Sequence, residues 1–174
     1  MESAGCLDIA CIKKLLTKQE CDSAKQPLCE ITRMLIGLRK AWSETAIREE
    51  PLPYRAESAS DSPRTLFHHE NLEVYRRALQ FMNWLVVVTE AVDLPNRLFR
   101  QIDETATSIV LNVAEGNGRF ADLDHRRFLQ MAQSAATKAG VCIDLCVQRV
   151  SLARRDVDVG KRLLHEISAM LAGF

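Results

Sequence analysis

The chain lacks a charge excess of either sign. Among its 174 residues, 23 Lys and Arg balance 23 Asp and Glu, so the formal net charge is zero. Proteins that coat nucleic acid by bulk electrostatics carry a strong basic excess, so the composition argues against that class and leaves only a local basic face. Aromatic residues are also scarce, at 6%. Since Trp84 and most of the phenylalanines fall in apolar patterns, base-specific readout by stacking is not expected.

A long hydrophobic run is absent as well. The longest apolar stretch, residues 81–92, is interrupted by Asn83 and Glu90 and is too short to span a bilayer. The N-terminus, MESAGC, has no basic segment followed by an apolar run and so does not resemble a secretory signal. We therefore expect a cytoplasmic protein without membrane contact.

Motifs for metal binding and catalysis are missing too. None of the six cysteines forms a C-x-x-C pair, which favours buried, reduced thiols. There is no Glu-x-x-His of the type used by di-iron bundles, and no nucleophile elbow, Walker loop or dinucleotide fingerprint. Asp122 and His125 have an i, i+3 spacing once, but a helix N-cap explains Asp122 better. We predict no catalytic residue, no metal ligand, no cofactor and no enzymatic activity.

The sequence is rich in helical periodicity. Apolar residues at spacings of three and four predict helices over residues 3–16, 18–48, 70–92, 96–115, 122–151 and 156 to the end. Pro27 predicts a kink or break near Gln26. The last four helices have short connections, which is typical of antiparallel neighbours, so the predicted fold is all-α, an up-down four-helix bundle.

The helix predicted over residues 122–151 carries a seam of small residues. Its a and d positions are Phe128, Ala132, Ala135, Ala139, Cys142 and Cys146. Small side chains on a seam allow two helix axes to approach closely.

The N-terminal part repeats the C-terminal part. When the chain is shifted by 136 residues, identical residues coincide in eleven pairs: Cys6/Cys142, Asp8/Asp144, Leu16/Leu152, Asp22/Asp158, Lys25/Lys161, Leu28/Leu164, Glu30/Glu166, Ile31/Ile167, Met34/Met170, Leu35/Leu171 and Gly37/Gly173. Residues 1–48 therefore look like the end of helix 3 and all of helix 4 from a preceding copy of one module.

This repeat divides the chain into three parts. We predict a partial repeat at residues 1–48, a flexible proline-containing linker at 49–69, and a complete four-helix module at 70–174. Because two helices alone cannot bury a core, the partial repeat is expected to dock onto the complete module or onto another chain. His68 and His69, at the edge of the linker, are expected to be exposed.

The stretch at residues 108–120, SIVLNVAEGNGRF, is the centre of the module. Ser108, Asn112 and Glu115 form a polar stripe along one helix. Gly116 is expected to end that helix with a positive φ, and Gly118 to allow a second turn. Two interpretations stay open: a well-capped corner between helices, or a contact surface that ends in Glu115 and Arg119.

Three segments carry a resemblance to a known family: NLEVYRRAL, QIDETATSIVLNVAEGNGRF and FLQMAQSAATKAGVCIDL. They resemble bacterial four-helix-bundle proteins encoded in intervening sequences of large-subunit ribosomal RNA genes, which are related to accessory variability proteins of diversity-generating retroelements. The resemblance implies a helical bundle that assembles with itself, often into a pentameric ring. It also implies RNA or a reverse-transcriptase-like protein as a partner.

Arginine dominates the basic residues of the complete module, with eleven Arg against two Lys. Arginine suits phosphate because its planar fork makes bidentate hydrogen bonds. A nucleic-acid or partner contact is therefore predicted at Arg119, His125, Arg126 and Arg127, where a helix N-terminus adds donors. The alternative is that these arginines are solvated helix ends, or reflect a GC-rich genome.

These observations predict a non-enzymatic, oligomeric scaffold or adaptor whose partner is RNA or a nucleic-acid enzyme. The alternative is a purely structural protein–protein interaction module without nucleic-acid binding. A third interpretation is a remnant of a tandem array without retained activity.

Overall fold

The computed structural model describes residues 2–46, 67–92, 96–118, 122–149 and 152–173. In this part of the chain the elements are helices: α1 (Glu2–Ile12), α2 (Lys18–Ala46), the short 3₁₀ helix η1 (His68–Asn71), α3 (Glu73–Ala91), α4 (Asn96–Asn117), α5 (Asp122–Arg149) and α6 (Arg154–Ala172). The all-α prediction is confirmed, and most boundaries fall within a few residues of the predicted ones.

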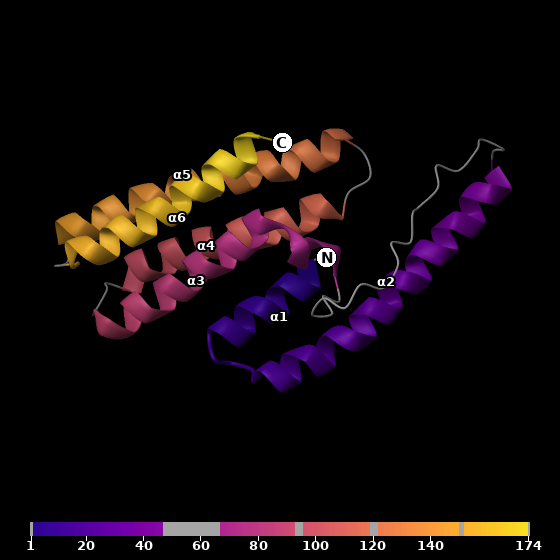
Figure 1. The fold of residues 1–174 in the computed structure, drawn as a ribbon, viewed down its shortest axis with the longest axis horizontal. Helices are drawn as coiled ribbons and strands as arrows, with labels where there is room; N and C mark the ends of the chain where they lie inside the picture. Colours follow the sequence, from indigo (N-terminus) through magenta and orange to yellow (C-terminus); the bar gives the residue numbers. More distant parts are fainter. Residues whose placement is uncertain (1, 47–66, 93–95, 119–121, 150–151, 174) are drawn as a thin grey trace.

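Helices α3 to α6 form the predicted four-helix bundle. Each packs against two of the others, in the cyclic order α3, α4, α5, α6, and Figure 1 shows α5 and α6 side by side over α3 and α4. Phe81, Met82, Ile109, Ile143 and Ile167 are fully buried at its centre. Each helix thus turns its apolar stripe inward, as its periodicity predicted.

The small-residue seam of α5 faces this core. Ala132 and Ala139 are fully buried and Cys142 is 3% exposed, whereas Phe128, the one large member, is only half-buried. The pair α4 and α5 has the most extensive contact in the molecule. Close approach of the two helices follows from the alanines, which confirms the prediction made for the seam.

The N-terminal helices lie outside the bundle. Helix α1 packs against α3 and α4, and α2 packs against α1; Figure 1 shows α2 extending away from the other helices. The prediction that the partial repeat docks onto the complete module is therefore met within one chain. The docking helix is α1; α2 packs on α1 and also reaches the complete module through the Lys25 side chain, which bonds to Glu70 of η1.

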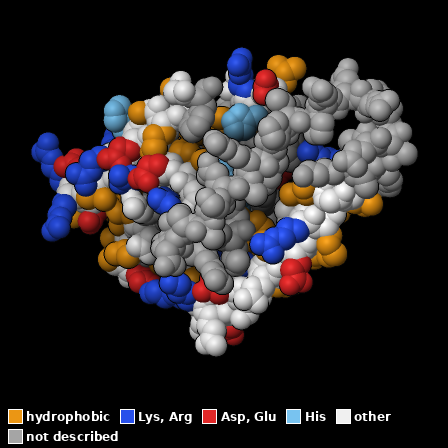
Figure 2. All heavy atoms as spheres, turned by 45° about the vertical axis from the view of Figure 1, so that its right-hand side comes forward, with side chains coloured by type: hydrophobic (Ala, Val, Ile, Leu, Met, Phe, Trp, Pro, Cys, Tyr) orange, Lys and Arg blue, Asp and Glu red, His pale blue; other side chains and the backbone are white. Residues whose placement is uncertain are grey.

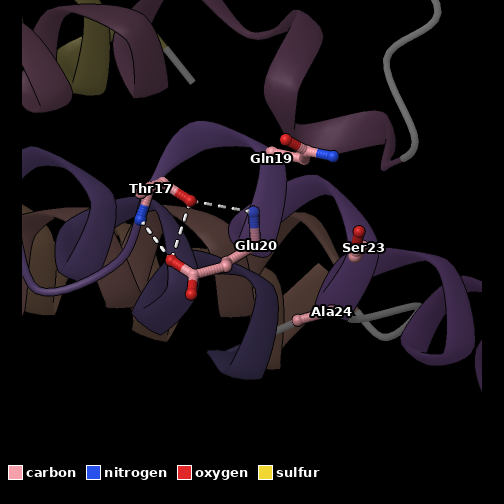
Figure 3. Close-up of a pocket in the computed structure, with 5 residues that line it drawn as sticks. All are labelled: Thr17, Gln19, Glu20, Ser23 and Ala24. Atoms are coloured by element: carbon pink, nitrogen blue, oxygen red, sulfur yellow. Dashed lines mark hydrogen bonds between the residues drawn. The ribbon is translucent and has the colours of Figure 1, made fainter.

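The turn between α1 and α2 is well defined. Lys14 has φ 58, and this left-handed residue follows the end of α1 and turns the chain towards α2. At the start of α2, Thr17 and Glu20 form a capping box: the Thr17 N–H donates to Glu20 Oε2 (2.8 Å) and the Glu20 N–H donates to Thr17 Oγ1 (3.3 Å). Figure 3 shows these bonds. Helix α1 is consequently shorter than the predicted helix at residues 3–16.

Three further expectations are wrong in whole or in part. Helix α2 continues through Pro27, so of the predicted kink or break near Gln26 the break is absent; since a proline removes a single donor and Pro27 is exposed, the helix tolerates it. Cys6 is exposed, unlike the predicted buried thiols. The end of the predicted linker is packed, because Phe67 is 5% and His69 0% exposed; the rest of the linker, residues 49–66, lies outside the described residues.

Gly160 marks a close approach between α6 and α3. A Cβ built at Gly160 would lie 2.5 Å from Cη2 and Cζ2 of Trp84, whose ring stacks on Phe81 with a centroid distance of 5.3 Å. We predict that Gly160→Ala lowers the free energy of unfolding by about 1–3 kcal/mol, because the indole ring must move within a packed layer. Urea denaturation measures this change.

Gly37 is the matched control, since a Cβ there meets nothing within 4 Å. Gly37→Ala should stabilise the protein by up to about 1 kcal/mol, because alanine has the higher helix propensity. Equal effects of the two substitutions would contradict the packing explanation.

Candidate functional site

The corner between α4 and α5 contains the residues predicted to bind nucleic acid. Arg126 and Arg127 are exposed in the first turns of α5. His125 is half-buried, and its Nδ1 lies 2.7 Å from the carbonyl oxygen of Gly116. A carbonyl oxygen only accepts, so Nδ1 carries the proton and donates it. His125 therefore caps the end of α4 and joins α4 to α5, and Arg119 lies outside the described residues.

Gly116 lies inside α4 and has no positive φ, contrary to expectation. A Cβ at this position would lie 3.1 Å from the Cβ of Phe128 and 3.6 Å from the backbone oxygen of His125. The glycine suits this position because α5 passes close to the end of α4, and not because the chain turns there. Gly118 closes the helix, with its N–H 3.0 Å from the Glu115 carbonyl oxygen.

The predicted polar stripe is directed partly into its own helix. Asn112 Nδ2 donates to the Ser108 carbonyl oxygen (2.8 Å) and to Ser108 Oγ (3.0 Å). All three members, Ser108, Asn112 and Glu115, are half-buried. Two of the three polar side chains thus bond to each other, which favours the interpretation of this stretch as a structural corner.

A second cluster, distant in sequence, lies where α1, α2, η1 and α3 meet. Lys25 Nζ donates to Asp8 Oδ1 and to Glu70 Oε1, each at 2.5 Å. The Tyr75 hydroxyl donates to Asp8 Oδ2 at 2.6 Å. The side chains of Lys25, Asp8 and Glu70 are 8%, 16% and 14% exposed. We call Asp8, Lys25, Glu70 and Tyr75 the buried lock, because they join the partial repeat to the complete module.

The surroundings of the buried lock shift the pKa values of two of its members, Lys25 and Tyr75. Burial alone would lower the pKa of Lys25, but the hydrogen bonds and charges of Asp8 and Glu70 outweigh it and raise that pKa. Burial and, after it, the Asp8 carboxylate raise the pKa of Tyr75. Lys25 thus stays charged, and the Tyr75 hydroxyl keeps the proton that it donates.

His69 is fully buried beside the lock, which corrects the expectation of an exposed pair with His68. Its ring is edge-on to Tyr75 at a centroid distance of 4.7 Å, and neither ring nitrogen has a hydrogen-bond partner among the described residues. Burial lowers the pKa of His69 to about 4, against the opposing effect of Glu70 and Asp8. Because the unfolded chain binds this proton more readily, stability falls as the pH drops from 6.5 towards 4.

Asp8, His69 and Glu70 could also hold a metal ion, since each offers a ligand atom within 4.8 Å of the others. Both carboxylates, however, already accept from Lys25, and Asp8 also accepts from Tyr75. The ammonium group is the cation that these carboxylates hold. The absence of metal ligands stays a prediction. The cluster was missed because Asp8 and η1 are far apart in the sequence, and no local spacing relates them.

The lock contains the N-terminal version of a repeated ion pair. Asp144 and Lys161 correspond to Asp8 and Lys25, and Lys161 Nζ also donates to Asp144 Oδ1. The first pair joins α1 to α2 and the second joins α5 to α6. This one contact is formed in both parts of the repeat, and the assignment of residues 1–48 as a partial copy of the module stays a prediction.

The corresponding helices α2 and α6 differ in how far other helices bury their apolar side chains. In α6, Ile167 is fully buried and Leu171 is 6% exposed, whereas the corresponding Ile31 and Leu35 of α2 are 47% and 60% exposed. We call Ile31, Met34, Leu35 and Leu38 the α2 apolar row; its members are at least 47% exposed. Figure 2, which turns this side of the molecule forward, shows hydrophobic side chains exposed among charged ones. An exposed row of this kind is typical of an interaction surface.

The hollow at the start of α2 is a weaker candidate for a binding site than the α2 apolar row. It is lined by Thr17, Gln19, Glu20, Ser23 and Ala24, and Figure 3 shows Thr17 and Glu20 bonded to each other in the capping box. Its polar groups thus serve the helix end. None of the described helices has the length and apolar character needed to cross a membrane.

The fold and these surfaces define an all-α protein in which a four-helix bundle is extended by an N-terminal pair of helices. Residues 70–173 match the sequence profile of the family described as 23S rRNA-intervening sequence protein, and the chain belongs to that family. The match covers α3 to α6 and begins where the complete module was predicted to begin. No curated protein matches the chain.

The exposures of the two repeated ion pairs predict different energetic roles. Lys25→Met should destabilise the protein by about 3–5 kcal/mol, because it leaves two buried carboxylates facing each other without a cation. Lys161→Met should cost less than about 1 kcal/mol, because that pair is 45% and 56% exposed. Urea denaturation of both variants at neutral pH measures the difference, and similar losses would contradict a structural role for the lock.

Proposed function

We propose that the protein is a non-enzymatic helical scaffold that associates through its helix faces, with a second copy of itself as its first partner. The observation that carries this proposal is the α2 apolar row. Its members Ile31, Met34 and Leu35 correspond to α6 residues that pack into the bundle core. The same side chains on α2 are exposed to water, so covering them with another helix would be favourable.

RNA is the second candidate partner. The family is described by its link to 23S rRNA intervening sequences, and Arg126 and Arg127 are exposed near the N-terminus of α5. The positive end of the helix dipole and the two guanidinium groups together suit phosphate. Since the chain has no net charge, such binding would be confined to this corner.

The α2 apolar row can be tested by charge insertion. Met34→Glu combined with Leu35→Glu should weaken self-association roughly tenfold or more, because each glutamate must be desolvated in the contact. Sedimentation velocity over a range of concentrations measures this. Leu15→Glu with Val87→Glu is the control, since both residues are exposed apolar side chains outside the row. A wild-type protein that stays monomeric at every concentration would contradict self-association.

The arginine corner is tested separately. Arg126→Glu with Arg127→Glu should reduce binding to single-stranded and hairpin RNA at least about tenfold at low salt, with an unchanged fold. Arg154→Glu with Arg155→Glu is the matched control, because it alters an exposed arginine pair at the start of α6, at the other end of the bundle. Fluorescence anisotropy measures the binding, and equal loss in both variants would indicate non-specific attraction only.

A further inference from the structure

The repeat relates two surfaces that have different neighbours. With the shift of 136 residues, Gly5, Asp8 and Ile9 of α1, and Lys13 directly after it, correspond to Val141, Asp144, Leu145 and Arg149 of α5. Helix α1 packs against α3 and α4. Their α5 counterparts, which we call the α5 outer face, are exposed: Val141 is 55% and Leu145 36% exposed, and Asp144 and Arg149 are exposed as well.

Helix α1 shows how such a face binds to α3 and α4. Gly5 lies against Leu111 and Ala114, since a Cβ added to this glycine would be 3.2 Å from Leu111 Cδ2 and 3.7 Å from the Ala114 Cβ. Ile9 is 7% exposed and belongs to the bundle core. We call Tyr75, Asp103, Leu111 and Ala114 the acceptor surface, because they receive α1.

Two polar contacts fix the register of α1 on the acceptor surface. Asp8 Oδ2 accepts from the Tyr75 hydroxyl at 2.6 Å, and Lys13 Nζ lies 2.7 Å from an Asp103 carboxylate oxygen. The α5 outer face carries the same chemistry at the same spacing, because Asp144 replaces Asp8 and Arg149 replaces Lys13. Both a carboxylate for Tyr75 and a cation for Asp103 are therefore present on it.

We propose that the acceptor surface is a self-assembly site for the α5 outer face of a second copy, and that α1 occupies this site within its own chain. The inference rests on the proposed function of self-association and adds to it a second contact, separate from the α2 apolar row. Donor and acceptor are different surfaces, so the contact is head-to-tail and can be repeated from copy to copy. A chain whose α1 is docked donates its α5 outer face but cannot accept one.

The fit differs between the two occupants at one position. Where α1 has Gly5, the α5 outer face has Val141, and a side chain there requires Leu111 Cδ2, the end of a flexible side chain, to move from a distance of 3.2 Å. Helix α1 is also tethered, so its effective concentration at the site is high. Both effects favour the intramolecular contact, and assembly through this site requires the release of α1.

Release of α1 in the full-length chain tests the proposal. Gly5→Arg with Ile9→Glu should displace α1 and convert the protein to dimers and larger species as concentration rises, measured by sedimentation velocity and native mass spectrometry. All variants carry Met34→Glu and Leu35→Glu, so that association through the α2 apolar row does not contribute and failure of that row is scored separately. Circular dichroism verifies that the bundle stays helical.

The donor face is tested in the same background. Val141→Glu with Leu145→Glu should return the released protein to a monomer, and should leave the mass unchanged where α1 is still docked. Asp103→Lys should also abolish assembly of the released protein, and adding Arg149→Asp should restore it. Lys13→Asp provides a milder release that leaves the apolar contacts intact, in case the stronger variant unfolds. A released, folded protein that stays monomeric, or assembly that the Val141 and Leu145 substitutions do not affect, would overturn the proposal.

Discussion

The arrangement of the molecule depends on one buried cation. Lys25 on α2 bonds at 2.5 Å to Asp8 on α1 and to Glu70 on η1, and so connects three segments of the chain. Removing an ammonium group and two carboxylates from water is costly, and this cost is offset only when all three are together. The position of α2 beside α1, and of both beside the bundle, follows from that requirement. Tyr75 extends the same constraint to α3.

The repeat allows equivalent residues to be compared in different surroundings within one chain. Asp144 and Lys161 form the same pair as Asp8 and Lys25, yet they are exposed because no counterpart of Glu70 or Tyr75 approaches them among the described residues. Ile167 is buried in the bundle core, whereas Ile31 is 47% exposed. The side chains are alike in each comparison, so the neighbouring helices decide whether a residue serves the core, an ion pair or an exposed surface.

Sequence reasoning was most accurate where the signal is local and periodic. The helices and the small seam of α5 follow from spacing along the chain, since a helix brings residues three and four apart onto one face. It was wrong where one element meets another. Gly116 was interpreted from its place near a helix end. Its constraint is instead the closeness of α5, because a Cβ added at Gly116 would lie 3.1 Å from the Phe128 Cβ. His69 was expected to be exposed and is buried. The bond from His125 to the end of α4 was not foreseen, and the partner contact predicted for His125 stays a prediction.

The sequence by itself therefore determined the all-α class and the number and order of the bundle helices in the complete module. It also determined the identical residues that relate the two ends of the chain. Only the tertiary structure decided which copy of each repeated residue is covered, where the charged residues of α1 and α2 find their partners, and that α1 occupies a surface of α3 and α4. The physical reason is that periodicity specifies which face of a helix is apolar, whereas burial and pKa depend on the helix that lies against that face.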